Sequence, residues 1–425
     1  MGKIRPTFKT IIIVLIFITF SCVGESNKMK SMQAQAPALK EIKEQTKPVI
    51  NVYIENSYSM DGYVNSDTEF KDAIFNYLGK IKMSGISDTL NLFYINRNVY
   101  PQGSVVQHSN STEMENFIKN LNPTNFKQKG GTHEDRQQSD IAKIIESVLS
   151  ETKDNRISIL VSDGIFSPGQ KEVSKSLSIQ QDEIAIVVNN ILRKQPKIAV
   201  IIYQLSSMFK SDTQKKIYFY NKNNDRINYT GQIPYYIYVF GNAEYLSELR
   251  NKITDSDFIG GGVTNVFSIV SGNQQVKYAI NQSIGIFDRD KQDPNKTINN
   301  LKKDNHTGKV KFAINVDFSN LLLDDSYLLN PDNYENSSKY TLEIKHSSTT
   351  KYTHVLYFTS DRVYVGTIMV KLKALLPDWI ETANDEMGTT AVKDKTYGIK
   401  YQLGGVFDAF TFTNKFYTEI KVNIK

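Results

Sequence analysis

Between residues 48 and 252, short runs of apolar and β-branched residues alternate with segments whose apolar positions recur every three to four residues. The first pattern is typical of strands buried on both faces, and the second of helices that bury one stripe. Strands are predicted at residues 49–55, 90–96, 156–162, 198–205 and 235–240. Helices are predicted at residues 67–83, 113–121, 139–150, 182–193 and 244–252. Because strands and helices alternate, we predict a doubly wound, mostly parallel α/β sheet over residues 48–255.

The pattern changes after the glycines at residues 260–262, where the helical period ends. Beyond them, apolar side chains occupy every second position, as in half-buried strands. The alternating runs are residues 310–318, 340–344, 354–359, 363–372 and 418–424. Polar, turn-rich segments separate these runs and favour an all-β, sandwich-like domain over residues 265–425. The glycine-containing run at residues 403–410 is interpreted as a turn that packs against the first unit, and the two units are predicted to fold separately.

The first 21 residues have the order of a secretory signal. Three basic residues precede the apolar run IIIVLIFITF at residues 11–20, and Ser21 stands before Cys22. This run is too short for a membrane-spanning helix, which needs roughly 20 residues. The segment resembles a bacterial lipoprotein signal, although a lone buried cysteine beside a short core helix is the alternative. The resemblance implies that residues 1–21 are removed, that the Cys22 thiol is acylated, and that residues 22–47 carry this anchor on a flexible tether.

Composition and charge narrow the class of protein. Of the 425 residues, 40% are hydrophobic and 23% are charged, which excludes a disordered chain. The formal net charge is +6, and half of it comes from Lys3, Arg5 and Lys9 in the predicted signal. The remaining surplus is too small to favour a nucleic-acid partner. Cys22 is the only cysteine, so no intrachain disulfide forms. The five histidines lack any i, i+4 pair, and we therefore predict no zinc site.

Polar residues gather where a doubly wound sheet binds its ligands, at the carboxyl ends of the strands. Three of them follow the first strand, one follows the strand at residues 156–162, and two precede the helix at residues 139–150. Carboxylate and hydroxyl oxygens suit Mg²⁺, or alternatively Ca²⁺ or Mn²⁺. The predicted metal ligands are Glu55, Ser57, Ser59, Thr132, Ser139 and Asp163.

Residues 47–253 resemble a von Willebrand factor A-type domain with a degenerate metal-ion-dependent adhesion site. That family has Asp-x-Ser-x-Ser after the first strand, a Thr before a central helix, and Asp-Gly after the fourth strand. Ser57, Ser59 and Asp163 match this pattern, whereas Glu55 stands where the family has Asp. Thr132 and Ser139 both compete for the Thr position, and the spacing to the helix favours Ser139. The resemblance implies a domain that docks a protein partner, whose carboxylate can complete the coordination of the ion.

The sequence therefore predicts a binding or adhesion module of the bacterial cell envelope. Its expected partners are an envelope protein and, through the acyl chains, a membrane, with the outer membrane expected and the face left open. The alternatives are a structural protein with an inert cleft and a metal-assisted hydrolase that uses Ser57 or Ser59 as its nucleophile. No G-x-S-x-G or P-loop motif is present, and His133 is the only histidine in the site loops. Since no base is poised beside either serine, we predict no enzyme activity and no catalytic residue.

Overall fold

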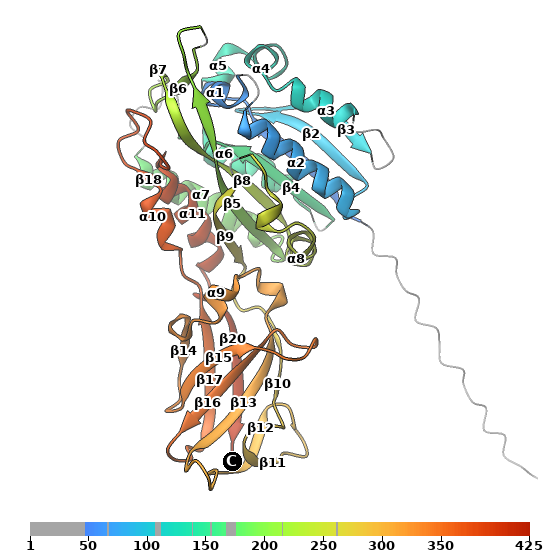
Figure 1. The fold of residues 1–425 in the computed structure, drawn as a ribbon, viewed down its shortest axis with the longest axis vertical. Helices are drawn as coiled ribbons and strands as arrows, with labels where there is room; N and C mark the ends of the chain where they lie inside the picture. The colour runs from blue at the N-terminus through green and yellow to red at the C-terminus, as the bar shows by residue number, and fades with distance from the viewer. Residues whose placement is uncertain are drawn as a thin grey trace, which may run out of the picture. The chain divides into compact units, whose positions relative to one another are not determined.

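A sheet of seven strands is the largest part of the fold (Figure 1). Its strands are β1 (Val49–Glu55), β2 (Thr89–Ile95), β3 (Val99–Val106), β4 (Arg156–Ser162), β5 (Ile198–Lys210), β8 (Thr230–Asn242) and β9 (Val263–Val270). The computed structural model describes residues 47–65, 68–106, 112–137, 139–153, 155–166, 176–214, 216–260 and 262–425. The predicted signal, the predicted lipidation site at Cys22 and nearly all of the tether lie outside the described residues.

The strand order of this sheet is β3-β2-β1-β4-β8-β5-β9. β1 pairs in parallel with β2 and with β4, whereas all the other neighbours in the sheet are antiparallel. The expectation of a mostly parallel sheet is therefore wrong, and the sheet is mixed. The physical reason lies in β5 and β8, which are joined as a hairpin and therefore pair in opposite directions. Its connection carries the small ribbon of β6 (Tyr218–Tyr220) and β7 (Arg226–Asn228).

Helices cover both faces of the sheet (Figure 1). α2 (Glu69–Ser84) and α8 (Ala243–Lys252) lie on one face, and α6 (Ile141–Ser150) and α7 (Leu177–Leu192) lie on the other. All the predicted strands and helices of this region are present, but three bounds differ by five residues: β5 ends five residues later than predicted, and β8 and α7 each begin five residues earlier. Ser176 sets the start of α7, because its side chain accepts a hydrogen bond from the backbone N–H of Ile179. Among the described residues, no helix is both long and apolar enough to span a bilayer.

The C-terminal region contains two larger sheets and a small one, in which β18 (Asn384–Asp385) pairs with β19 (Thr396–Tyr397). One larger sheet contains β10 (Lys277–Ile280), β13 (Val310–Asp317), β16 (His354–Ser360) and β15 (Thr341–His346), in that order. The other contains β11 (Ile286–Arg289), β12 (Thr297–Lys302), β20 (Phe416–Ile424), β17 (Gly366–Lys373) and β14 (Tyr334–Asn336). The predicted alternation is confirmed in β13, where every second side chain from Val310 to Val316 is fully buried. Most neighbours in the two larger sheets are antiparallel, and β12 and β20 are parallel.

Two elements of the C-terminal region pack against the first one. β9 forms an edge of the seven-stranded sheet, and α11 (Ile399–Thr411) packs against α7. A side chain at Gly405 would lie 2.5 Å from the carbonyl oxygen of Gln181, so glycine permits this close approach of the two helices. The interpretation of residues 403–410 as a turn is therefore wrong, because the two adjacent glycines serve helix packing. Separate folding of the two predicted units stays a prediction.

Candidate functional site

The candidate site lies at the carboxyl ends of β1 and β4, the two central parallel strands. From β1 the chain passes through α2 to β2 on one side, and it later reaches β4 on the other side. A reversal of this kind opens a crevice beyond the strand ends, where α/β sheets bind ligands. Glu55 is the last residue of β1, and Asp163 directly follows β4. Both side chains are fully buried, at 0% exposure.

The carboxylate of Glu55 accepts hydrogen bonds from two serine hydroxyls. The Oγ of Ser139 donates to Oε1 at 2.7 Å, and the Oγ of Ser162 donates to Oε2. The same Ser162 hydroxyl accepts a hydrogen bond from the backbone N–H of Gly164 at 2.9 Å. Glu55 is thus tied both to the segment before α6 and to the end of β4.

The carboxyl group of Asp163 is only partly satisfied. Its Oδ1 accepts a hydrogen bond from the backbone N–H of Ile165 at 3.0 Å. Its Oδ2 is buried and has no hydrogen-bond partner among the described residues. Close by, the hydroxyls of Ser57 and Ser59 lie 2.9 Å apart and bond to each other. An unpaired carboxyl oxygen in such a dry position carries a free-energy penalty that a proton or a cation would remove.

Burial and mutual repulsion both disfavour two negative charges at this site. Burial raises the pKa of Glu55, and the hydroxyls of Ser162, Ser139 and Ser57 only partly oppose that rise. Burial also raises the pKa of Asp163, and the nearby charge of Glu55 raises it further. The pair therefore holds on to protons well above the usual range for carboxyl groups, unless a cation compensates the charge.

The donor set fits a small divalent cation with a preference for oxygen ligands. Two carboxyl groups and three hydroxyls face this region, and one carboxyl oxygen is already without a partner. Mg²⁺, Mn²⁺ and Ca²⁺ bind such oxygen sets, and Mg²⁺ keeps several waters. The side chains that would hold the ion are Glu55, Ser57, Ser59, Ser139 and Asp163.

Arg136 fixes the loop that carries the two serines. Its Nε donates to the carbonyl oxygen of Asn56 at 2.7 Å, and its guanidinium forms an ion pair with Asp61. The guanidinium also lies 4.6 Å from the ring centroid of Tyr58. The Arg136 side chain is 2% exposed, so these contacts are shielded from water. Arg136 is therefore a positioning residue for this loop.

A second set of contacts anchors the same loop from the other side. Asn56 Nδ2 donates to the carbonyl oxygen of Gly130 at 2.9 Å, and Asn96 Nδ2 donates to that same oxygen at 2.7 Å. Asn96 Nδ2 also donates to Asn56 Oδ1 at 3.0 Å. A Cβ at Gly130 would lie 1.8 Å from Asn56 Nδ2, so only glycine fits at this position beside the asparagine amide.

The structure distinguishes the two hydroxyls that the sequence leaves open. Ser139 is buried against Glu55, whereas Thr132 is an exposed N-cap residue of α5 (His133–Arg136). The Thr132 hydroxyl donates to Asp135 Oδ2 at 2.8 Å and accepts from the Asp135 backbone N–H. The Thr132 hydroxyl therefore caps α5, and it makes no hydrogen bond with Glu55.

Sequence reasoning missed Ser162, Arg136, Asn56 and Asn96. Ser162 carries a usable signal, because it is the last residue of a buried strand and stands beside a predicted ligand. Nothing in the local pattern marks Arg136 or Asn96, because the partners that place them in this site are distant in the chain. Asn96 and Gly130 are 34 residues apart, and Arg136 and Asn56 are 80 apart.

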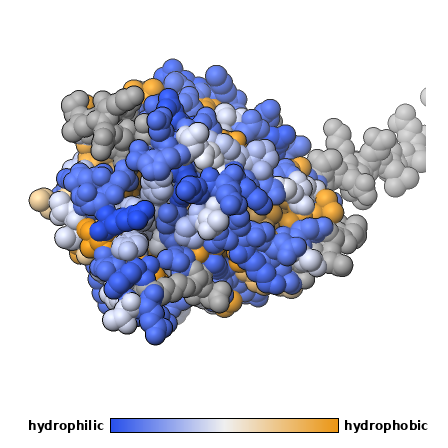
Figure 2. Space-filling view, turned by 90° about the horizontal axis from the view of Figure 1, so that it is seen from above, coloured by the Kyte–Doolittle hydropathy of each residue, from blue (hydrophilic) through white to orange (hydrophobic). Residues whose placement is uncertain are grey.

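The end of the sheet that carries α1 (Asp61–Val64), α4 (Pro123–Lys129) and α5 presents a mostly hydrophilic surface. Figure 1 places these elements together with β6 and β7 at one end, and Figure 2 looks onto that end. Hydrophobic residues are scattered there among polar ones.

No protein-family model matches the chain, and a search of curated proteins also finds no match. The fold and the geometry of the site therefore carry the functional argument.

Proposed function

We propose that the chain is a lipid-anchored binding module of the bacterial cell envelope, which docks a protein partner at the carboxyl ends of β1 and β4 through a divalent cation. One observation carries the proposal. Glu55 and Asp163 are fully buried at neighbouring strand ends, and Asp163 keeps a carboxyl oxygen without a partner. A bound cation would satisfy that oxygen and leave a coordination position for a carboxylate of the partner.

We further propose that the seven-stranded region is a variant of the von Willebrand factor A-type domain. The reversal of strand order at β1 and the arrangement of Ser57, Ser59 and Asp163 around the strand ends support this assignment. The antiparallel strand β8, inserted between β4 and β5, is a departure from a parallel sheet. We propose that the two C-terminal sheets form a sandwich that serves as a spacer or second contact surface.

The membrane anchor in this proposal rests on the sequence of the first 22 residues. The basic start, the short apolar run and Ser21 before the single cysteine support acylation of Cys22. We propose a binding role rather than a catalytic one, because the hydroxyls of Ser57 and Ser59 bond to each other and, among the described residues, neither is hydrogen-bonded to a histidine.

The test compares two hydroxyl variants in thermal unfolding with and without Mg²⁺, Mn²⁺ or Ca²⁺. At a hundredfold excess over Kd, the ion should stabilise the parent protein by about 2.7 kcal/mol. Ser139→Ala should lose most of this gain, since Ser139 faces Glu55. Thr132→Ala is the matched control, and it should lose only a helix cap, about 1 kcal/mol, while keeping the response to the ion.

Capture of a partner from native envelope membranes completes the test. The parent and Thr132→Ala should retain the same envelope protein, and a chelator should release it. Ser139→Ala should retain little of it. A melting temperature indifferent to all three ions, or a partner held equally in chelator, would contradict a cation-dependent docking site.

A further inference from the structure

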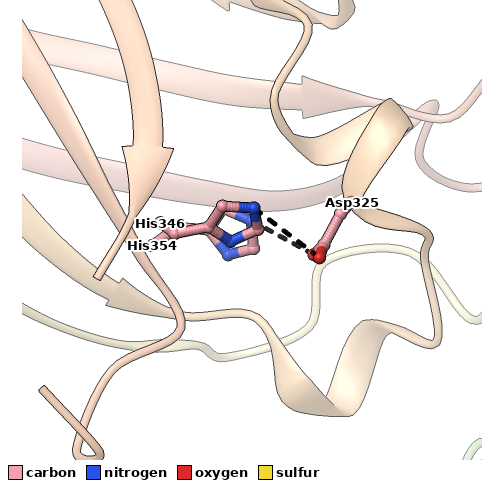
Figure 3. Close-up of side chains that lie close together, drawn as sticks. All are labelled: Asp325, His346 and His354. Atoms are coloured by element: carbon pink, nitrogen blue, oxygen red, sulfur yellow. Dashed lines mark ion pairs between the residues drawn. The ribbon is translucent and has the colours of Figure 1, made fainter. Parts of the chain in front are cut away.

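A second cluster of chemically active side chains lies in the C-terminal region, away from Glu55 and Asp163. In the hairpin of β15 and β16, His346 and His354 are directly opposite each other. Their ring centroids are 5.4 Å apart. Asp325, the first residue of α9 (Asp325–Leu328), points its carboxylate toward both rings (Figure 3). The nearest ligand atoms of the three side chains all lie within 4.8 Å of one another.

The contacts of the Thr353 hydroxyl are the basis for assigning the hydrogen to one ring nitrogen of His354. The hydroxyl of Thr353 donates to the carbonyl oxygen of Val316 at 3.3 Å and accepts from the backbone N–H of Phe318 at 2.9 Å. With that hydrogen placed toward Val316, the hydroxyl accepts from His354 Nδ1, which lies 2.9 Å away. On this arrangement we assign the hydrogen of the neutral ring to Nδ1, which leaves a lone pair on Nε2.

That lone pair faces the Asp325 carboxylate without a bridging group. His354 is 2% exposed, and its Nε2 has no hydrogen-bond partner among the described residues. Asp325 Oδ1 lies 3.6 Å away, beyond hydrogen-bond range. Two electron-rich atoms that face each other at this distance repel, and a cation between them would turn the repulsion into attraction.

The separations suit a tetrahedral metal ion. Ligand atoms at 2.0–2.2 Å from such an ion lie about 3.4 Å apart. Asp325 Oδ1 is 3.6 Å from His354 Nε2, and Asp325 Oδ2 is 3.8 Å from His346 Nε2. The three ligand atoms, one from each residue, lie within 4.8 Å of one another, so they must draw closer to hold one ion. The side chains of Asp325 and His346 are 64% and 59% exposed, which leaves both free to make that movement. The buried His354 supplies the fixed point.

We propose that Asp325, His346 and His354 form a binding site for Zn²⁺, with a fourth position open to water. Two imidazole nitrogens and one carboxylate favour Zn²⁺ over Mg²⁺ and Ca²⁺, which prefer oxygen ligands. Asp325 and His354 also line a cavity of about 560 Å³ bordered by Arg250 and Ser319, which gives the fourth position access to solvent. The ion would fasten α9 to the β15–β16 hairpin.

The test uses the full chain, stripped of metal by a chelator and titrated with Zn²⁺ by calorimetry. The parent should bind one Zn²⁺ at this site, and Co²⁺ should give the visible absorption of a four-coordinate ion. His346→Ala and Asp325→Asn alter exposed side chains and should fold normally, while their affinity for Zn²⁺ falls at least tenfold, or about 1.4 kcal/mol. Asp163→Ala should bind Zn²⁺ like the parent, which separates this site from the one at β1 and β4.

His306→Ala is the matched control, because His306 is an exposed histidine in the loop between β12 and β13. It should leave the affinity unchanged. An equal loss in His306→Ala and His346→Ala would show scattered surface binding and overturn the proposal. So would a parent protein that takes up no Zn²⁺, or one that binds Mg²⁺ more tightly at this site.

Discussion

At the residue scale, the site is defined by carboxyl groups that lack a counter-charge. Glu55 is satisfied by hydroxyls, and Asp163 is satisfied by one backbone amide on only one of its two oxygens. Glutamate is longer than aspartate by one methylene, and in this chain the extra reach brings Glu55 to both Ser139 and Ser162. Glu55, which differs from the Asp of the adhesion-site pattern, thus accepts hydrogen bonds from two hydroxyls of the candidate site.

The raised pKa values of Glu55 and Asp163 predict a stability that declines with pH in the absence of divalent ions. The folded state keeps protons that the unfolded chain releases near pH 4. Below that range the two groups make their full contribution to the free energy of unfolding. This contribution is lost as the pH rises through their raised pKa values. Each proton contributes up to about 1.4 kcal/mol per pH unit. Urea unfolding in chelator, between about pH 5 and about pH 8, measures this decline.

Three comparisons make that prediction specific. Asp163→Asn removes one titrating group and should flatten the decline, and saturating Mg²⁺ should flatten it in the parent. Asp332→Asn, at an exposed carboxyl group, should leave the slope unchanged. A free energy of unfolding that rises with pH over this range would mean that the pair is not buried without a cation.

At the scale of elements, short polar contacts between loops hold the strand ends in register with one another. Gly130, at the end of α4, receives amide hydrogen bonds from Asn56 after β1 and from Asn96 after β2. The packing leaves no room for a side chain there, since a Cβ would also lie 2.7 Å from the carbonyl oxygen of Phe126. This glycine is required for space and not for an unusual backbone angle.

Two glycine-to-alanine substitutions should therefore have opposite effects. Gly130→Ala forces the amides apart and should cost about 1–3 kcal/mol of unfolding free energy. Gly79→Ala, inside α2, meets only Met114 Cε at 3.7 Å and should gain about 0.5–1 kcal/mol through helix propensity. Chemical denaturation of both variants checks the pair. Equal effects would show that the asparagine contacts do not constrain the loop.

At the scale of the whole molecule, two segments of the C-terminal region pack against the region that holds the seven-stranded sheet. β9 adds an edge strand beside β5, and α11 packs on α7 through Gly405. The change in hydrophobic period predicts a boundary between two units, and these contacts join residues on opposite sides of it. Contacts across the predicted boundary oppose independent folding, because each unit would lose them when it folds alone.

Limited proteolysis of the full chain tests whether the two predicted units stay associated after the connection between them is cut. A cut near residues 255–262 should leave fragments that migrate together in gel filtration, because β9 and α11 remain packed against the first region. Denaturant should be needed to separate them. Two fragments that separate in buffer and each keep their secondary structure would instead support fully independent units.

The anchor can be tested on the whole molecule in cells. Cys22→Ser removes the thiol that would be acylated and should release the protein from the membrane fraction into the soluble fraction. Ser21→Ala, which keeps a small residue before the cysteine, is the matched control and should stay with the membranes. Membrane association of Cys22→Ser would contradict the lipid anchor.

The sequence by itself determined most of the local structure of this protein. Strands such as β4 and helices such as α2 follow from periods of two and of three to four, which are set by neighbours in the chain. It also singled out Glu55, Ser57, Ser59 and Asp163, because a strand that ends in polar residues can be recognised locally, and it proposed Thr132 and Ser139 as alternatives before a helix. The proposed ligation and anchoring remain predictions for experiment.

Only the tertiary structure decided how distant segments pair. The insertion of β8 between β4 and β5, the clamp of Arg136 on Asn56, and the return of α11 to α7 depend on contacts between residues far apart in the chain. His346 and His354 illustrate the same limit at shorter range. Residues eight apart lie about 12 Å apart along a helix, too far to share an ion, and these two become neighbours only because a hairpin sets them opposite each other. Periodicity reports which face of an element is buried, whereas the identity of the group it is buried against is a property of the packed molecule.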